Sequence, residues 1–192
     1  MLPELTWLVP SPGPAELGES SIAFASGPNT DLFTDPGGAD PRAEAPVLLA
    51  RPGGDFQLSA RVSAPLVSTF DAAALVVWAS PTAWGKLALE FSPQRAATIV
   101  SVVTRGVSDD ANAFTVPEPV AWLRVARSGE TFAFHASLDG LWWSLIRYFT
   151  LEGAAGAAVG FLVQSPSGDG VYGRFDELEW SDEPLADLRN GS

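Results

Sequence analysis

Residues 84–91 read WGKLALEF and residues 97–104 read ATIVSVVT, and these two stretches decide the fold class. In the first, Leu87, Leu89 and Phe91 recur at every second position, which is the period of a half-buried β-strand. The second is rich in β-branched residues, which fit the pleated surface of a sheet. Both stretches therefore predict strands rather than helices.

The same pattern continues along the chain in both directions. Further strands are expected at 54–63, 72–79, 121–127, 131–137, 142–149, 157–164 and 171–180. Hairpin-type turns are expected at 128–130 and 138–140, because the sequences Ser-Gly-Glu and Leu-Asp-Gly are typical of tight turns. The 18 Gly and 16 Pro interrupt the chain too often for a helical bundle. About ten strands predict an all-β sandwich or barrel, with under about a tenth of the residues in helices.

A single domain is expected, because no linker or internal repeat divides the 192 residues. A chain of this length can bury a core without disulfides or metals. We expect one domain over residues 1–182 and a short tail over 183–192, in which 183–189 could form one or two helical turns. The stretch 26–46 is rich in Pro, Gly and Asp, and such a long connection is typical of functional or mobile loops.

Composition excludes several kinds of site and partner. The absence of cysteine excludes disulfides, cysteine zinc sites and thiol catalysis. A net charge of −12 makes nucleic acids and anionic membranes poor partners. No stretch is typical of a signal peptide or a membrane helix, which favours a cytoplasmic location. We expect no cofactor and no metal, since the aspartates at 31, 35 and 40 and at 109–110 do not have the spacing of an EF-hand loop.

Strand alternation places a distinctive set of side chains on the faces away from the core. On the strand at 84–91, Trp84, Lys86 and Glu90 lie opposite Leu87 and Leu89. The same alternation gives Trp78, Arg124, Trp143 and Arg147 to non-core faces. Trp and Arg with few other charges suit a recessed binding face better than a solvated one. A plain solvated face and a structural ion-pair network across the strands stay open as alternatives.

An ordered set of motifs resembles a known family. It comprises NTDLF at 29–33, GDF at 54–56, WGKLALE at 84–90, TRGVSD at 104–109, LRV at 123–125, SLDG at 137–140, Arg147, and the stretch from Gly160 to Ser165-Pro166. The set is similar to the uncharacterised concanavalin A-like domains grouped with the "regulation of enolase" proteins, over about Trp7 to Trp180. The resemblance implies a jelly-roll sandwich of two antiparallel sheets, one of them concave, in a domain of unknown function. Its matching positions are Lys86, Glu90, Ser108, Asp109, Arg124 and Arg147. The position after Ser-Asp is often aromatic in such sequences, whereas here it is Asp110.

The predicted function is ligand binding without catalysis, on a concave face that carries Trp, Arg, Lys and Glu. The predicted site residues are Trp78, Trp84, Lys86, Glu90, Asp109, Arg124, Trp143 and Arg147. Four of them, Lys86, Glu90, Arg124 and Arg147, are expected to converge on one sheet face. Tryptophan rings could carry the C–H faces of a carbohydrate or sugar-like small molecule, while the cations bind its hydroxyls or an anionic group.

Two other functions stay open. A retaining glycosidase needs two carboxylates about 5–5.5 Å apart. Glu90 is the only carboxylate on its strand face, and the neighbouring Lys86 should lower the pKa of Glu90, which does not suit a general acid. A glycan hydrolase using Glu90 would need Asp109 as its second carboxylate. The third possibility is a protein-interaction module, and His135, the one histidine, is expected to be structural.

Overall fold

The computed structural model describes residues 2–192, and these residues are almost entirely β. The strands are β1 (Leu5–Val9), β2 (Glu16–Leu17), β3 (Ile22–Ala25), β4 (Leu32–Phe33), β5 (Arg42–Ala43), β6 (Val47–Ala50), β7 (Phe56–Ser63), β8 (Ala72–Ser80), β9 (Ala83–Phe91), β10 (Ala97–Arg105), β11 (Val107–Thr115), β12 (Val120–Ser128), β13 (Thr131–Ser137), β14 (Ser144–Thr150), β15 (Ala158–Gln164) and β16 (Tyr172–Ser181). In this described part, one short 3-10 helix, η1 (Ala154–Gly156), is the only helical element. The all-β prediction is confirmed, whereas the helical turns expected at 183–189 are wrong because that segment forms bends and turns.

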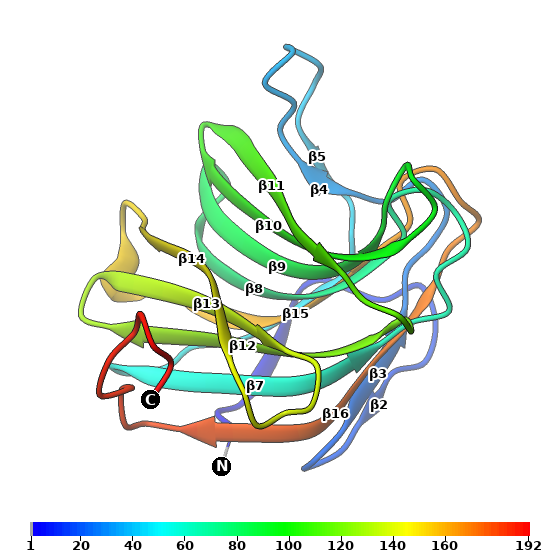
Figure 1. Ribbon diagram of the computed structural model, residues 1–192. Coiled ribbons are helices and arrows are strands. Elements are labelled where there is room, and N and C mark those ends of the chain that lie inside the picture. Colours follow the sequence, from blue (N-terminus) through cyan, green and yellow to red (C-terminus); the bar gives the residue numbers. More distant parts are fainter. Residues whose placement is uncertain (1) are drawn as a thin grey trace.

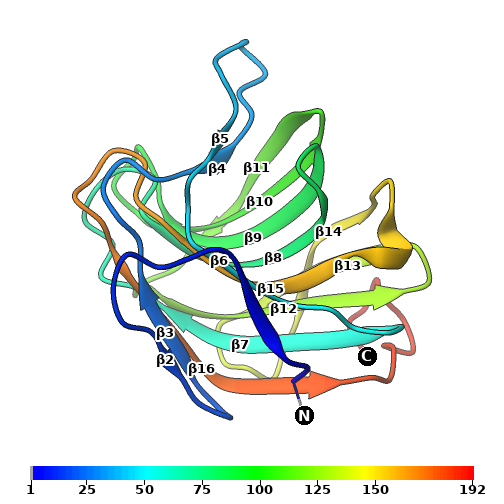
Figure 2. The same ribbon diagram turned by 180° about the vertical axis from the view of Figure 1, so that it is seen from behind.

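Two antiparallel sheets of seven strands lie face to face (Figure 1). Sheet A has the order β1-β6-β15-β8-β9-β10-β11, and sheet B has the order β14-β13-β12-β7-β16-β3-β2. The two-stranded ribbon of β4 and β5 lies above sheet A, on the side away from sheet B (Figures 1 and 2). This arrangement confirms the predicted sandwich of two antiparallel sheets.

The main core lies between the sheets and follows the predicted alternation. Leu75, Leu87 and Leu89 of sheet A and Leu58 and Phe134 of sheet B are fully buried in it. Each fully buried side chain of this kind contributes roughly 1.5–3 kcal/mol through the area that it removes from water. The strand pattern read from the sequence is therefore the pattern that holds the two sheets together.

The outer face of sheet A is also buried, by the segment at 30–46. Leu32 and Ala45 of this segment pack over an apolar layer that contains Trp84 and Val102. Backbone hydrogen bonds between Thr30 and Ser165 fasten the start of the segment to the end of β15. The long Pro- and Gly-rich stretch is therefore a cover over part of this face, and it lines one side of the cavity described below.

The outer face of sheet B is partly covered by the tail at 183–192. Leu185 and Leu188 pack on Ala126 and Ala133, which point outward from β12 and β13. The buried ring of His135 donates from Nε2 to the carbonyl oxygen of Leu188 at 2.9 Å. No helix in the described residues has the length and apolar character needed to cross a membrane.

Candidate functional site

The structure distributes the predicted site residues over three places. Trp78, Trp84, Lys86 and Glu90 lie on the outer face of sheet A, since β8 and β9 are neighbours there. Arg124 and Trp143 lie together on the outer face of sheet B, with the Arg124 guanidinium carbon 4.3 Å from the centre of the Trp143 ring system. Asp109 and Arg147 form an ion pair, Nη2 to Oδ1 at 3.0 Å, between the edge strands β11 and β14.

The prediction that Lys86, Glu90, Arg124 and Arg147 converge is therefore wrong. β9 belongs to sheet A and β12 to sheet B, so the main core separates Lys86 from Arg124. A β-bulge between β13 and β14 is a second reason why Arg147 lies away from the predicted face. The bulge sets Arg147 opposite the core residue Phe134 and places Leu145 opposite His135, so Arg147 does not share a face with Trp143.

Lys86 and Glu90 line a partly open cavity of about 190 Å³ on the outer face of sheet A. Its other lining residues come from β4, β10, β11 and β15 and from two connections outside the strands: Asp31, Phe33, Phe70, Val100, Val102, Asp110 and Gln164. Ala74 and Ala88 pair in register on β8 and β9 on the same face as Lys86. The 30–46 segment contributes Asp31 and Phe33 to the walls of the cavity.

Lys86 is buried and held by two strong hydrogen bonds. Its Nζ donates to the carbonyl oxygen of Leu32 at 2.7 Å and to Oε1 of Gln164 at 2.8 Å. The Asp31 carboxylate lies 3.8 Å from the same nitrogen, which is an ion-pair distance but no hydrogen bond. Burial lowers the pKa of Lys86, and the negative charges of Asp31, Glu90 and Asp110 oppose that effect.

Asp31 supplies the most informative polar atom of the cavity. Its Oδ1 is buried and has no hydrogen-bond partner among residues 2–192. An unsatisfied buried acceptor of this kind costs about 1–3 kcal/mol. The cavity therefore contains an acceptor that a ligand donor would satisfy.

Burial raises the pKa of Glu90 to about 7, more than the neighbouring Lys86 lowers it. The expectation that the pKa of Glu90 is lowered is therefore wrong, because desolvation outweighs the attraction of the Lys86 charge. Asp31 and Asp110 raise the pKa of Glu90 further. Three carboxyl groups and one ammonium group line the cavity, so it has an excess of acids.

Replacing Glu90 by Gln should change how stability depends on pH. Between its ordinary pKa of 4.5 and its folded pKa of about 7, Glu90 binds a proton in the native state that it loses on unfolding. The native state is therefore destabilised as the pH rises through this window. We expect Glu90→Gln to exceed the wild type in free energy of unfolding by about 2 kcal/mol near pH 8, and by clearly less near pH 5.

Urea titrations at the two pH values measure this difference. The loss of stability that His135 causes at acid pH serves as the internal control, because it should be the same in the wild type and in Glu90→Gln. Burial and Arg124 lower the pKa of His135 to about 4, so its contribution is present at neutral pH and is lost as the pH falls. The acid-side loss should therefore persist in Glu90→Gln. An equal gain for Glu90→Gln at both pH values would contradict the raised pKa.

The tryptophans on sheet A do not line the cavity. Trp84 is 1% exposed and belongs to the apolar layer under the 30–46 segment, and the half-buried Trp78 packs against the same layer. The predicted role of Trp84 as an open platform for a sugar ring is therefore wrong. Phe33 and Phe70 form the aromatic walls instead.

Sequence reasoning missed Phe33, Phe70 and Gln164 as cavity residues. Phe33 lies within the NTDLF motif, which was an available signal, whereas no local pattern marks Phe70 or Gln164. Phe70 adopts a positive φ of 71°, which is strained for a residue with a side chain. Strain of this kind is concentrated at functional sites, where the surrounding structure maintains it.

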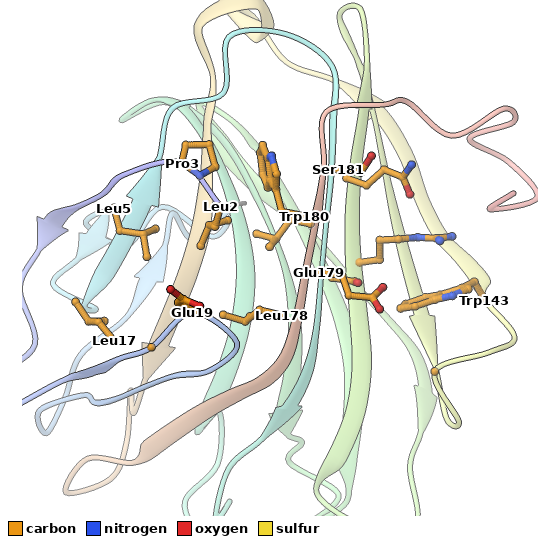
Figure 3. A pocket seen from close by; sticks show the side chains of 16 residues that line it. Leu2, Pro3, Leu5, Leu17, Glu19, Trp143, Leu178, Glu179, Trp180 and Ser181 are labelled. Atoms are coloured by element: carbon orange, nitrogen blue, oxygen red, sulfur yellow. The ribbon is translucent and has the colours of Figure 1, made fainter.

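A larger and more open groove of about 960 Å³ crosses the outer face of sheet B (Figure 3). Apolar side chains of Leu2, Leu5, Leu17 and Trp180 gather on one side of it, and Trp143 and Glu179 lie on the other. The guanidinium of Arg124 is engaged there by Trp143 and by the tail, since Nη2 donates to the Gly191 carbonyl oxygen at 2.7 Å. Arg124 and Trp143 thus hold the tail in place.

The chain matches the model of one protein family. The model of the family described as "Protein of unknown function (DUF1349)" matches residues 7–183. The chain belongs to the DUF1349 family. A search of curated proteins finds no match to this DUF1349 protein.

Solved structures with the same architecture include a functionally unknown protein from Saccharomyces cerevisiae. It has a TM-score of 0.86 and 24% identity, with 95% of this chain and 97% of that chain covered. A xylan β-1,4-xylosidase from Bacillus halodurans C-125 has a TM-score of 0.68 and 13% identity, and the DUF1349 chain covers 39% of it while 94% of the DUF1349 chain is matched. An alginate lyase from Klebsiella pneumoniae has a TM-score of 0.54 and 14% identity, covering 87% of this chain and 83% of that one. At these identities the similarities show the fold alone.

Proposed function

We propose that this DUF1349 protein binds a small polyhydroxy molecule, a single sugar unit or a sugar-like metabolite, in the cavity around Lys86 and Glu90. The observation that carries this proposal is the buried, unpartnered Oδ1 of Asp31. A ligand hydroxyl would donate to it and remove the cost of the unsatisfied acceptor. The same hydroxyl could accept from Lys86, whose nitrogen lies 3.8 Å from that oxygen.

The size and composition of the cavity support a ligand of this class. A volume of about 190 Å³ has room for about six waters at roughly 30 Å³ each, which matches the size of one sugar unit. Phe33 and Phe70 offer apolar walls for C–H groups, while Asp110 and Gln164 offer further acceptors and an amide donor. The excess of carboxyl groups disfavours an anionic ligand. The carbohydrate-active proteins that share the fold support the same class.

A second candidate function is proton-transfer catalysis on a glycan by Glu90. The observation that favours it is the raised pKa of Glu90, because a general acid or base works best when its pKa is near the working pH. Asp31 or Asp110, which line the same cavity, would supply the second carboxylate. Release of reducing sugar that disappears in Glu90→Gln would establish this activity.

Calorimetric titration with monosaccharides and small polyols tests the binding proposal. We expect saturable binding by the wild type and a loss of affinity of about tenfold or more in Asp31→Asn, which weakens the acceptor for the ligand hydroxyl. Trp143→Ala is the matched control, because Trp143 lies on the other sheet and its loss should leave the affinity unchanged.

Equal affinity in the wild type and in Asp31→Asn would place the ligand elsewhere. Loss of binding in Trp143→Ala alone would move the site to the groove of sheet B. No heat with any polyol, together with capture of a purified protein partner, would favour the interaction module.

Several expectations from the sequence stay predictions. They are the grouping with the "regulation of enolase" proteins, the cytoplasmic location, and the absence of nucleic-acid and membrane partners. The net charge of −12 is the physical argument for the last of these.

A further inference from the structure

Lys86 is the only lysine of the chain, and the other ten cationic side chains at neutral pH are arginines. It is also the cation at the centre of the cavity, with 2% of its side chain exposed. An arginine at this position could not serve as a nucleophile, because its guanidinium does not lose its proton in proteins, whereas a buried lysine loses its proton readily.

The hydrogen bonds of Lys86 use two of the three ammonium protons and leave the third without an acceptor in the described residues. Leu32 and Gln164 accept two of the three ammonium protons at 2.7 and 2.8 Å. The third potential acceptor, Asp31 Oδ1, is 3.8 Å away and forms no hydrogen bond. Loss of the third proton to water would therefore leave the two hydrogen bonds intact and free the lone pair of a fixed amine.

Glu90 lines the same cavity, and no ion pair joins its carboxyl to Lys86 in the described residues, so a bound ligand would lie between the two groups. Gln164 pairs with Ala72, and Ala72 pairs with Glu90, so the three residues form one row across β15, β8 and β9. Neighbouring strands are about 4.8 Å apart, so this row spans about 10 Å. The Lys86 nitrogen is bonded to Gln164 at one end of the row, and the carboxyl of Glu90 lies at the other end, next to the same cavity.

We propose that Lys86 forms a reversible imine with an aldehyde or ketone ligand, such as the open-chain form of a small hydroxyaldehyde. This inference rests on the proposed function, since the hydroxyls of the ligand would be held as described above. The amine nitrogen bonds to the carbonyl carbon, and the carbonyl oxygen takes up a proton from Glu90. Glu90 regains a proton from the nitrogen and donates it to the hydroxyl, which leaves as water while the nitrogen lone pair forms the C=N bond. The second nitrogen proton then returns to Glu90, so the carbonyl oxygen and both hydrogens of the amine are released as one molecule of water.

The environment supports this chemistry. Burial lowers the pKa of Lys86, and each unit of lowering raises the amine fraction at neutral pH about tenfold. Glu90 can both give and take a proton near neutral pH, because burial raises its pKa to about 7. The small volume restricts the reaction to carbonyl compounds of a few carbons or one sugar unit.

Reductive trapping tests the inference on the intact protein. Glycolaldehyde and cyanoborohydride are added near neutral pH, and the adducts are assigned by intact mass and peptide mapping. The variant Arg51→Lys supplies an internal comparison, because residue 51 is exposed and the variant then has one surface lysine and one buried lysine. We expect Lys86 to be labelled about tenfold faster or more than the lysine at position 51. Glu90→Gln should slow the labelling of Lys86 and flatten its pH profile without affecting position 51.

Labelling of Lys86 that is slower than at position 51, or that speeds up when the protein is unfolded in urea, would overturn the inference. Calorimetry with a polyol that has no carbonyl group separates this failure from failure of the proposed function. Polyol binding without trapping at Lys86 would leave the proposed function standing and remove the imine. Absence of both polyol binding and fast labelling would remove both.

Discussion

Replacing Lys86 by Met should lower the free energy of unfolding by about 3–5 kcal/mol. Met retains most of the volume of the lysine chain, so the loss comes from polar groups rather than from a new cavity. The carboxylate of Asp31, 16% exposed, would lose the one ion-pair partner that it has among residues 2–192, and Leu32 and Gln164 would lose the donor to two buried oxygens. Removing one member of a buried pair is costly because the remaining charge is left without compensation.

Urea denaturation of matched variants measures this effect. Arg51→Met makes the same change at an exposed cation and should stay within about 0.5 kcal/mol of the wild type. Combining Lys86→Met with Asp31→Asn should recover part of the loss, since the second change removes the uncompensated charge. A loss of under about 1 kcal/mol in Lys86→Met would show that the ion pair and its hydrogen bonds contribute little.

Strand alternation predicts correctly which side chains share a face of one strand. Trp84, Lys86 and Glu90 share a face of β9 as expected, because the two-residue period of a strand is a local property. Arg124 was assigned correctly to the outer face of its own strand, and the error was to assume that β12 belonged to the same sheet as β9. Which sheet a strand joins depends on contacts between distant residues, and alternation contains no information about them.

Two further properties of the site depend on structure that the local sequence does not show. A single bulged residue in β14 reversed the face of Arg147 relative to Trp143. The pKa of Glu90 is raised and not lowered as expected, because burial under the 30–46 segment desolvates the carboxyl. From the sequence only the charge of Lys86 was visible, and it predicts the smaller of the two effects.

Replacing Gly160 by Ala should destabilise the protein by about 3 kcal/mol or more, which is at or beyond the upper range for overpacking. A Cβ at this position would lie 1.9 Å from the carbonyl oxygen of Leu48 and 2.9 Å from its carbonyl carbon. These are backbone atoms of β6, which pairs with β15, so no side-chain rotation can relieve the contact. β6 and β15 would have to separate, and the ladder between them would be disrupted.

Gly156→Ala is the matched control, because a Cβ there meets no atom within 4 Å and the substitution should be close to neutral. In Gly160→Ala, chemical denaturation should show a lower free energy of unfolding, and the rate of Lys86 labelling should change as well. The two are linked because β15 also contains Gln164, which accepts a hydrogen bond from Lys86. A shift of β15 would lengthen that hydrogen bond and alter the cavity four residues further along the strand. A Gly160→Ala variant with the stability of the wild type would contradict the close approach of β6 to β15. If instead it is destabilised but Lys86 keeps its reactivity, the displacement ends before Gln164 and the cavity is anchored by the bonds between Thr30 and Ser165.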